Sequence, residues 1–281
     1  MPGTLFVVAT PIGNLEDITA RALRVLREVH VIAAEDTRRT AHLLARYAIT
    51  TATTSLHEHN ETAKTRSIID RLERGDHVAL VSDAGTPTVS DPGRTLVQAA
   101  IAAGIKVEPV PGPNAAIATL AASGFAADRF AFFGFPPTGS KDRAKWMDDL
   151  GAMGGIAVFY EAPHRILTTL ADLARKYGDR PICLGRELTK AHEQFLRGSI
   201  SEVIATVGEP KGEFTVVLDI GHPNEYNVAA PPSESAIAAE FGEMTNMPGM
   251  TRRRVVAALA KKHHLPANVV YAAIEGAKKL G

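Results

Sequence analysis

The sequence predicts an α/β protein with two α/β domains and a small helical domain at its C-terminal end. Apolar strands alternate with amphipathic helices through the first half of the chain. An aromatic strand and a Pro-rich break at 126–140 then begin a different pattern, and basic helical segments follow residue 233. We therefore expect domains at 1–125 and 126–222, a linker at 223–232 and a helical domain at 233–281.

The first domain is predicted to contain a largely parallel sheet with helices on both faces. Short apolar runs such as Val78–Val81 are typical of buried strands, and each is followed by a segment with helical spacing of its apolar residues. The expected strands are 5–9, 31–33, a strand near Thr53, 78–81 and 107–110. The expected helices are 20–27, 40–47, 62–74, 95–103 and one that begins after Asn114.

The second domain is predicted to contain a mixed sheet, because only one or two helical turns separate its last two strands. Strands are expected at 129–135, 156–160, 182–186, 192–197 and 213–220, with helices at 143–150 and after Pro163. The run 221–232 contains Asn, Tyr and three prolines, a composition typical of a linker.

The C-terminal segment concentrates positive charge. Residues 251–281 contain seven Lys or Arg and one acid, a formal charge of +6, which leaves −6 for residues 1–250 because the whole chain is neutral. Thr251 can cap a helix at 252–261, and Leu265-Pro266 turns the chain into a second helix at 267–279, as in a helix-turn-helix unit. This pattern favours contact with a polyanion, although a solvated helical face gives the same count.

The two expected helices have an apolar set of residues and a cationic set. The apolar positions expected to pack the helices together are Val255, Leu259, Val269, Val270 and Ile274. The cations expected to bind nucleic-acid phosphates are Arg252, Arg253, Arg254, Lys261 and Lys262. No code for reading bases can be extracted from them.

Three loops of small residues follow predicted strands and indicate a ligand site. They are 9–15, 83–93 and 111–114. Since they carry little side chain, their backbone amides can reach a ligand at the carboxyl ends of the strands, where open α/β sheets bind ligands. Gly and Pro also punctuate ordinary turns, so one loop alone carries little weight. The loops match neither a Walker loop nor a G-x-G-x-x-G turn.

Composition excludes several classes of protein. A chain of 281 residues with 45% hydrophobic content can bury one large or two medium cores. No run approaches the roughly twenty apolar residues of a membrane span, and the N-terminus lacks a signal pattern, so we expect a soluble cytoplasmic protein. The single Cys183 lies in an apolar run and predicts a buried, inert thiol. His57 and His59 have no third partner in view, so no metal site is expected.

Seven segments carry a resemblance to a known family: LFVVATPIGNLEDIT, AAEDTRRT, SLHEHNE, VALVSDAGTPTVSDPG, PVPGPNAAI, FYEAPHR and GRELTK. They occur in order, and over nearly all of 4–220 the chain resembles the ribosomal RNA small subunit methyltransferase I family of tetrapyrrole methylases. The resemblance implies two αβα domains, usually in a homodimer, that bind S-adenosylmethionine in the cleft between them. It further implies methyl transfer to the ribose 2′-oxygen of a cytidine in the decoding region of 16S rRNA, within the small ribosomal subunit.

The resemblance also implies which residues bind the cofactor. They are Pro11, Asp83, Ala84, Gly85, Val89, Ser90, Asp91 and Ser123 in the first domain, and Phe159, Tyr160, Leu188 and Thr215 in the second. Asp83 or Asp91 is expected to pair with the ammonium or the ribose hydroxyls of the cofactor. Ala84 and Gly85 permit close approach of the backbone.

A ribose hydroxyl is a poor nucleophile at neutral pH, so catalytic help is expected. A general base, or a cation that stabilises the alkoxide, is worth about 10²–10⁴ in rate. The catalytic candidates are Lys190, Glu35, Asp36, Arg38 and Glu187, each just past a predicted strand; Glu161 and Arg186 occupy similar positions. Helix capping also explains Glu35 and Asp36, and a structural ion pair also explains Glu187. Lys190 and Glu35 are the strongest candidates.

Two other functions stay open on the sequence. A carbon methyltransferase acting on a tetrapyrrole or another small molecule would share the fold and the cofactor, but it has no need for a basic C-terminal domain. A nucleic-acid-binding regulator would explain that domain and leave the three loops without a purpose. Cofactor binding separates the regulator from both enzymes.

Overall fold

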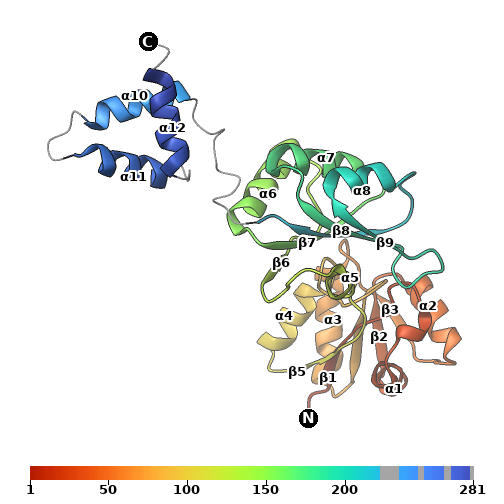
Figure 1. Ribbon diagram of the computed structural model, residues 1–281. Coiled ribbons are helices and arrows are strands. Elements are labelled where there is room, and N and C mark those ends of the chain that lie inside the picture. Colours follow the sequence, from red (N-terminus) through yellow and green to blue (C-terminus); the bar gives the residue numbers. More distant parts are fainter. Residues whose placement is uncertain (222–233, 246–249, 263–266, 279–281) are drawn as a thin grey trace. The chain divides into compact units, whose positions relative to one another are not determined.

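The computed structural model describes residues 1–221, 234–245, 250–262 and 267–278. The chain divides into two compact units, residues 1–221 and 222–281. The first unit holds two five-stranded sheets with their helices (Figure 1). The predicted linker at 223–232 lies outside the described residues. The predicted division of the first unit at residue 125 stays a prediction.

The first sheet is parallel and has the strand order β3-β2-β4-β1-β5. Its strands are β1 (Thr4–Val8), β2 (Val31–Ala34), β3 (Thr53–Ser55), β4 (Val78–Val81) and β5 (Lys106–Val110). The short helix η1 (Leu15–Asp17) and α1 (Ala20–Glu28) connect β1 to β2, and the following connections contain α2 (Thr37–Arg46), α3 (Glu61–Glu73) and α4 (Arg94–Ala102) in turn. The prediction of a parallel sheet between helices is confirmed.

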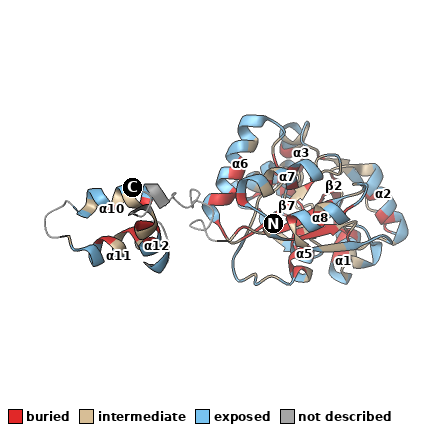
Figure 2. Ribbon diagram, turned by 45° about the horizontal axis from the view of Figure 1, so that its top comes forward, coloured by how far each residue is buried: buried red, intermediate tan, exposed pale blue. Residues whose placement is uncertain are grey.

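Both faces of this sheet are buried, because alternate strand residues point to opposite sides. Val8 and Ile32 belong to the core on the side of α1 and α2, whereas Leu5 and Leu80 belong to the core on the side of α3 and α4. All four residues of β4 are buried, and Figure 2 shows the buried residues gathered along the strands. The sheet is therefore a rigid base for the loops at its carboxyl edge.

The second sheet is mixed and has the strand order β6-β7-β10-β8-β9. Its strands are β6 (Phe130–Phe132), β7 (Ile156–Glu161), β8 (Pro181–Arg186), β9 (Gln194–Ser199) and β10 (Phe214–Asp219). Only β6 and β7 pair in parallel. The connections of this sheet contain α6 (Ser140–Met153), α7 (Ile166–Tyr177) and α8 (Ile200–Thr206). The last strand in the chain, β10, thus lies at the centre of the sheet.

Helix α5 (Ala115–Ser123) joins the two sheets. The loop before it leaves β5 of the first sheet, and the side chain of Asn114 caps the helix by accepting from the backbone N–H of Ile117. Leu120 then packs in one core cluster with Val158 and Cys183 of the second sheet. Burial raises the pKa of the Cys183 thiol, as expected for the inert thiol that its apolar run predicts.

The C-terminal unit is built from α10 (Glu234–Thr245), α11 (Arg252–Lys262) and α12 (Ala267–Lys278). Their shared core contains Ile237, Phe241, Val255, Leu259, Val270, Ala273 and Ile274. The predicted core positions Val255, Leu259, Val270 and Ile274 are confirmed, whereas Val269 is 43% exposed and its predicted place in this core is wrong. None of the helices in the described part of the chain is long and apolar enough to cross a membrane.

Candidate functional site

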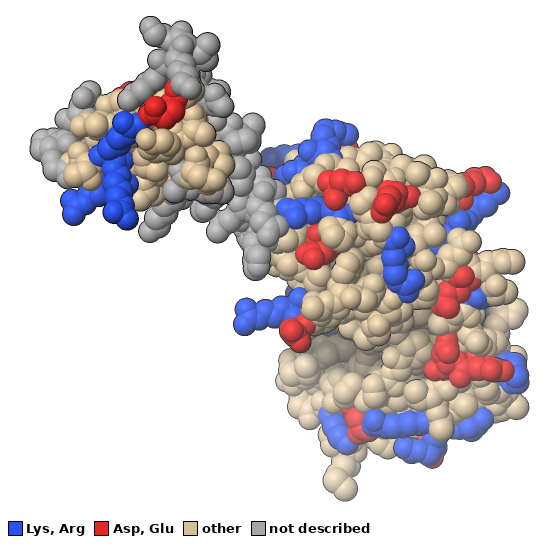
Figure 3. All heavy atoms as spheres, in the orientation of Figure 1, with Lys and Arg blue, Asp and Glu red and all other residues tan. Residues whose placement is uncertain are grey.

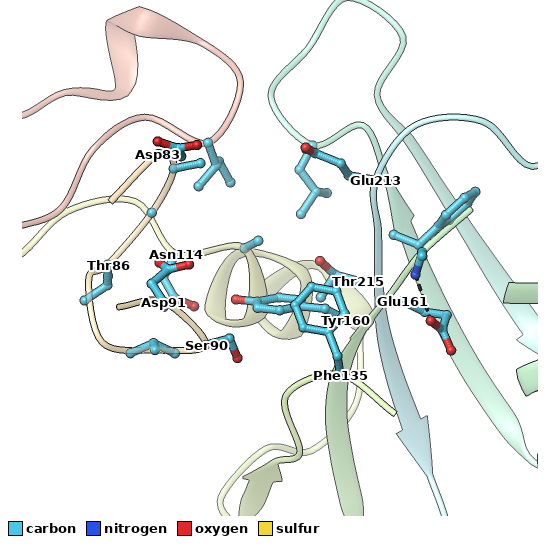
Figure 4. A pocket seen from close by; sticks show the side chains of 18 of the residues that line it. Asp83, Thr86, Ser90, Asp91, Asn114, Phe135, Tyr160, Glu161, Glu213 and Thr215 are labelled. Atoms are coloured by element: carbon cyan, nitrogen blue, oxygen red, sulfur yellow. Dashed lines mark hydrogen bonds between the residues drawn. The ribbon is translucent and has the colours of Figure 1, made fainter. Parts of the chain in front are cut away.

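A cavity of about 310 Å³ lies in the first unit, between the carboxyl edge of the first sheet and the second sheet. Figure 4 shows Asp83, Ser90 and Asp91 on one side of it and Phe135, Tyr160 and Thr215 on the other. Its lining residues are Ile12, Glu35, Asp83, Ala84, Gly85, Thr86, Val89, Ser90, Asp91, Asn114, Ala115, Phe135, Tyr160, Glu161, Ala162, Pro163, Leu188, Glu213, Phe214 and Thr215.

The three predicted loops meet at this cavity, because β4, β1 and β5 are neighbours in the first sheet. Thr10 and Gly85 exchange backbone hydrogen bonds of 2.8 and 3.0 Å, which join the loops after β1 and β4. The hydroxyl of Thr86 donates to the carbonyl of Pro113 at 3.3 Å and ties in the loop after β5. The loops therefore form one continuous surface.

Gly85 has a φ of +81°, a backbone conformation that a side chain with a Cβ rarely adopts. A Cβ at this position would lie 3.4 Å from Cγ2 of Ile12, which is ordinary contact. Gly85→Val is therefore expected to lower the affinity for S-adenosylmethionine mainly by distorting the loop. Calorimetric titration measures this loss, and Gly104→Val, in open space at a φ of +68° on a distant turn, is the control. Unchanged affinity in Gly85→Val would contradict a role for this loop in binding.

Three carboxylates gather on the first-sheet side of the cavity. The backbone N–H of Asp83 donates to the carboxylate of Glu35 at 3.2 Å. The guanidinium of Arg39 lies 3.4 Å from the carboxylate of Asp83. Burial raises the pKa of Glu35, and the charge of Asp83 adds to this effect. Burial likewise raises the pKa of Asp91 to about 6, with the charges of Glu35 and Asp83 adding to it and a hydrogen bond from Ser82 opposing it. The cluster is thus poised to receive positive charge.

Asp36 and Arg38 lie outside the cavity lining. Asp36 caps α2 by accepting from the backbone N–H of Arg38 at 2.9 Å, and its carboxylate also pairs with the guanidinium of Arg38 at 2.8 Å. These hydrogen bonds from Arg38 hold the pKa of Asp36 well below its usual range. The helix-capping explanation of Asp36 therefore has direct structural support.

Aromatic side chains form the opposite wall of the cavity. The rings of Tyr160 and Phe135 have centroids 5.3 Å apart, and the ring of Tyr160 reaches toward Asp91 (Figure 4). Burial raises the pKa of Tyr160, so the phenol stays neutral. Glu161 also contributes to this wall, but its buried carboxylate is already bound by Arg165 and Thr169. The aromatic wall offers flat apolar surface, and the carboxylate of Glu161 is used in contacts at the N-terminal end of α7.

The loop at 187–190 closes one end of the cavity in a strained conformation. Glu187 and Thr189 have φ angles of +51° and +63°, and across the cavity Thr88 and Ser90 have φ angles of +71° and +67°. Such non-glycine residues cost on the order of 1–3 kcal/mol each and collect at functional sites. Leu188, between the two strained residues of the first loop, lines the cavity.

Lys190 and Glu187 are bound to each other at 3.0 Å, and Lys190 also contacts Glu213 at 2.9 Å. Burial disfavours the charge of Lys190, but hydrogen bonds to Glu213 and Glu187 outweigh burial and raise its pKa. Burial also raises the pKa of Glu187, but the hydrogen bond and the charge of Lys190 outweigh burial, so the pKa of this carboxyl is lowered. Both groups therefore stay charged, which suits Lys190 to the role of a cation rather than a base.

Some sequence-predicted residues lie behind the cavity. Pro11 is buried beside the lining residue Ile12. Ser123 is buried and donates to the carbonyl of Leu120, and Phe159 is fully buried against Trp146. None of these three lines the cavity. Sequence reasoning left out the lining residues Ile12, Thr86, Asn114, Ala115, Phe135, Ala162, Pro163, Glu213 and Phe214, although most lie in segments that it had singled out.

The described residues offer no group of three or more His, Cys, Asp or Glu side chains able to hold a metal ion. The rings of His57 and His59 lie 6.0 Å apart, centroid to centroid. Asn60 holds His57 through its side chain, so the polar SLHEHNE segment is tied to its own turn.

The C-terminal unit presents several cations, and Figure 3 shows Lys and Arg side chains side by side on one face of it. Arg253 and Arg254 are exposed. Lys262 pairs with Glu240 at 2.8 Å, and the side chain of Lys261 lies outside the described residues.

Arg252 makes several contacts within the C-terminal unit. Its guanidinium stands 5.8 Å from the ring of Phe241 and 5.3 Å from the ring of Tyr271, and it pairs with Glu275. Arg252→Ala is therefore expected to destabilise the C-terminal unit by about 1 kcal/mol, since exposed cation–π contacts and ion pairs each contribute about 0.5–1 kcal/mol. Hydrogen exchange of the α11 and α12 amides measures the loss. Arg253→Ala is the matched control, and equal protection in the two variants would contradict this role.

Comparisons with known proteins identify the family of the chain. Residues 4–204 match the family model of the Tetrapyrrole (Corrin/Porphyrin) Methylases. A ribosomal RNA small subunit methyltransferase I of Synechocystis sp. is 44% identical over 272 residues, 96% of each chain. The protein of that name from Bacillus subtilis is 42% identical over 271 residues, 96% of this chain and 93% of its own length.

Two solved structures share the fold. Diphthine synthase superposes with a TM-score of 0.60 at 15% identity, over 77% of this chain and 90% of its own. Uroporphyrin-III-C-methyltransferase from Thermus thermophilus superposes with a TM-score of 0.54 at 22% identity, over 78% of this chain and 95% of its own. The chain therefore belongs to the tetrapyrrole methylase family, and within it to the ribosomal RNA small subunit methyltransferase I group.

Proposed function

We propose that this protein transfers a methyl group from S-adenosylmethionine to the ribose 2′-oxygen of a cytidine in 16S rRNA. The observation that carries the proposal is the 44% identity to a ribosomal RNA small subunit methyltransferase I over 96% of both chains, a span too long to leave out the C-terminal unit. A cavity at the carboxyl edge of the first sheet supplies the matching site.

The cavity suits the cofactor in size and in charge. Its volume of about 310 Å³ falls in the range of small-molecule sites, about 300–1,000 Å³. The carboxylates of Asp83 and Asp91 complement the positive sulfonium and ammonium groups of S-adenosylmethionine. Tyr160 and Phe135 offer an apolar wall for its adenosine part. The buried Pro11, Ser123 and Phe159 act by supporting these walls.

The bound cofactor supplies a methyl group already activated by the positive sulfur atom. The chain has to hold the ribose hydroxyl in line and take its proton. Glu35 takes that proton in our proposal, because it lines the cavity and burial brings its pKa closer to neutrality. Lys190 remains protonated beside the cavity and offsets negative charge on the RNA.

RNA binding by the C-terminal unit belongs to the same proposal, with Arg253 and Arg254 as its exposed cations. A homodimer and a cytoplasmic location, beside the ribosomes, rest on the family resemblance. Light scattering coupled to size-exclusion chromatography tests the dimer, since a monomer mass would contradict it.

The reaction is tested with labelled S-adenosylmethionine and unmodified small ribosomal subunits, with stripped 16S rRNA as the comparison substrate. Nuclease mapping locates the label. Label on a cytidine ribose is the expected result, and the comparison shows whether the assembled particle is needed. Cofactor binding without label on either RNA would contradict the proposed function.

A further inference from the structure

The exposed face of α2 is basic along its whole length. Helix α2 (Thr37–Arg46) buries Thr40, Leu43 and Leu44 against the first sheet. The exposed positions are Arg38, Arg39, Ala41, His42, Ala45 and Arg46. The helix contains no acidic residue, and the exposed residues between its cations include two small alanines. This set of six exposed residues is called the α2 face below.

The neighbouring helix α1 shows what an ordinary solvated face looks like in this protein. Its Arg21 pairs with Glu108, Arg24 pairs with Glu28, and Arg27 donates to a backbone carbonyl. On the α2 face, Arg38 and Arg39 also pair, with Asp36 and Asp83, but Arg46 has no carboxylate partner among the described residues and lies 5.4 Å from the ring of Tyr47. Its charge is therefore available to an external anion.

The α2 face leads away from the cofactor cavity. At the N-terminal end of the helix, Arg39 contacts Asp83, which lines the cavity. At the C-terminal end, Arg46 lines a second, open hollow of about 570 Å³, whose other lining residues include Asn14, Glu16 and Lys190. Figure 1 shows the loop between β8 and β9 coming close to α2, as this shared hollow requires.

One thin wall separates the hollow from the cavity. Ile12 and Leu188 line the cavity, and the residues that follow them, Gly13 and Thr189, line the hollow. The backbone N–H of Asn14 donates to the Thr189 hydroxyl at 2.9 Å, and a Cβ on Gly13 would lie 2.6 Å from the carbonyl oxygen of Leu188. The backbones of the two loops are thus packed against each other. A ligand bound in the hollow would therefore lie directly beside the cavity.

We propose that the α2 face and the hollow at its end bind the sugar-phosphate backbone of single-stranded RNA next to the target nucleotide. This inference rests on the proposed function, since it assigns the RNA path to that site. Arg38 and Arg46 are eight residues apart, about 12 Å along a helix, which lets the α2 face meet more than one phosphate. Glu16 and the carboxylates paired with Lys190 keep the hollow from being uniformly positive and restrict anion binding to the α2 side.

The test measures binding of 16S rRNA, stripped of protein, across a salt series from about 50 to about 200 mM. Arg46→Gln is expected to weaken binding about tenfold and to lower the slope of log Kd against log salt by about 0.7–0.9. Arg38→Gln combined with Arg46→Gln is expected to lower the slope further, by less than a second full step because Arg38 also pairs with Asp36. Arg46→Lys keeps the charge and is expected to stay near the wild type.

Arg24→Gln makes the same chemical change on the exposed face of α1 and is the matched control, with an expected slope equal to that of the wild type. Arg46→Gln that behaves like Arg24→Gln would overturn the proposal, as would Arg46→Lys that binds as weakly as Arg46→Gln. Calorimetric binding of S-adenosylmethionine is expected to be unchanged in all these variants and reports on folding.

The same experiments separate this inference from the proposed function. Wild-type protein that methylates the RNA while the α2 variants bind it normally would overturn the α2 path alone. Wild-type protein that binds the RNA with the expected salt dependence and transfers no methyl group would contradict the proposed function alone.

Discussion

Glu35→Gln is expected to lower the turnover of methyl transfer by about 10²–10⁴-fold, the usual contribution of a general base. The amide oxygen still accepts the hydrogen bond from the backbone of Asp83, so the shape of the cavity is kept. Only the capacity to take a proton is lost. Single-turnover rates with small ribosomal subunits measure the change, and titration with S-adenosylmethionine is expected to give a nearly unchanged dissociation constant.

The dependence of the methyl-transfer rate on pH tests the role of Glu35 directly. Burial raises the pKa of Glu35, so the wild-type rate is expected to rise with pH as this carboxyl ionises above its ordinary value of 4.5. That limb of the profile is expected to vanish in Glu35→Gln. Lys190→Gln is the comparison, because its amine stays protonated: it is expected to lower the rate and leave the limb in place. A wild-type profile retained in Glu35→Gln would remove Glu35 from the mechanism.

Asp91→Asn is expected to weaken binding of S-adenosylmethionine by about 10- to 100-fold, because hydrogen bonds to charged groups contribute about 1.5–3 kcal/mol. Asp91 lines the cavity among two further carboxylates, and the variant removes one negative charge from a site that receives a cation. Its pKa of about 6 means that wild-type affinity is expected to be full above pH 6 and to fall as the pH drops through that value. In Asp91→Asn this dependence should disappear.

The same substitution is expected to stabilise the protein. The pKa of Asp91 is about 6 when folded and 3.8 ordinarily, so the folded state binds more protons between these values. Its stabilising effect is present below pH 3.8 and lost as the pH rises through 6, which leaves a buried, unfavourable charge at pH 7. Asp91→Asn should therefore raise the free energy of unfolding at pH 7 by on the order of 1 kcal/mol, after discounting for partial solvent exposure.

Thermal unfolding without cofactor at pH 5 and pH 7 measures this effect, and a gain at pH 7 that shrinks at pH 5 is the expected pattern. Asp70→Asn, on the exposed face of α3, is the control and should change neither stability nor cofactor affinity. A less stable Asp91→Asn at pH 7 would show that the carboxylate has a structural partner. Together the two measurements would identify Asp91 as a residue kept for binding at the expense of stability.

The sheets and the loops of the cavity could be predicted because each depends on a local signal. The buried run Val78–Val81 and the small residues after it require only the chain's own sequence to be recognised, and the neighbouring positions of β4 and β1 then bring Gly85 to Thr10. The second sheet was predicted to be mixed because the connection before β10 is short. Local pattern and tertiary structure agree at these positions.

Charged residues were harder to assign, because their roles depend on partners distant in sequence. Arg252 is one of three consecutive arginines, and only the folded unit places it between Phe241 and Tyr271. Lys190 is a candidate base in the sequence, and only its contact with Glu213 shows that it stays protonated. Likewise, nothing in the sequence indicates that Glu187 and Thr189 adopt positive φ angles.

The central position of β10 has a consequence for how the protein is made. This strand is the last of its sheet to leave the ribosome, yet it pairs with both β7 and β8 and carries Phe214 and Thr215 into the wall of the cavity. A nascent chain that ends before residue 214 leaves two strands with open edges, which are prone to wrong pairing. Synthesis must therefore pass residue 219 before the second sheet can close and before the wall formed by Phe214 and Thr215 is in place.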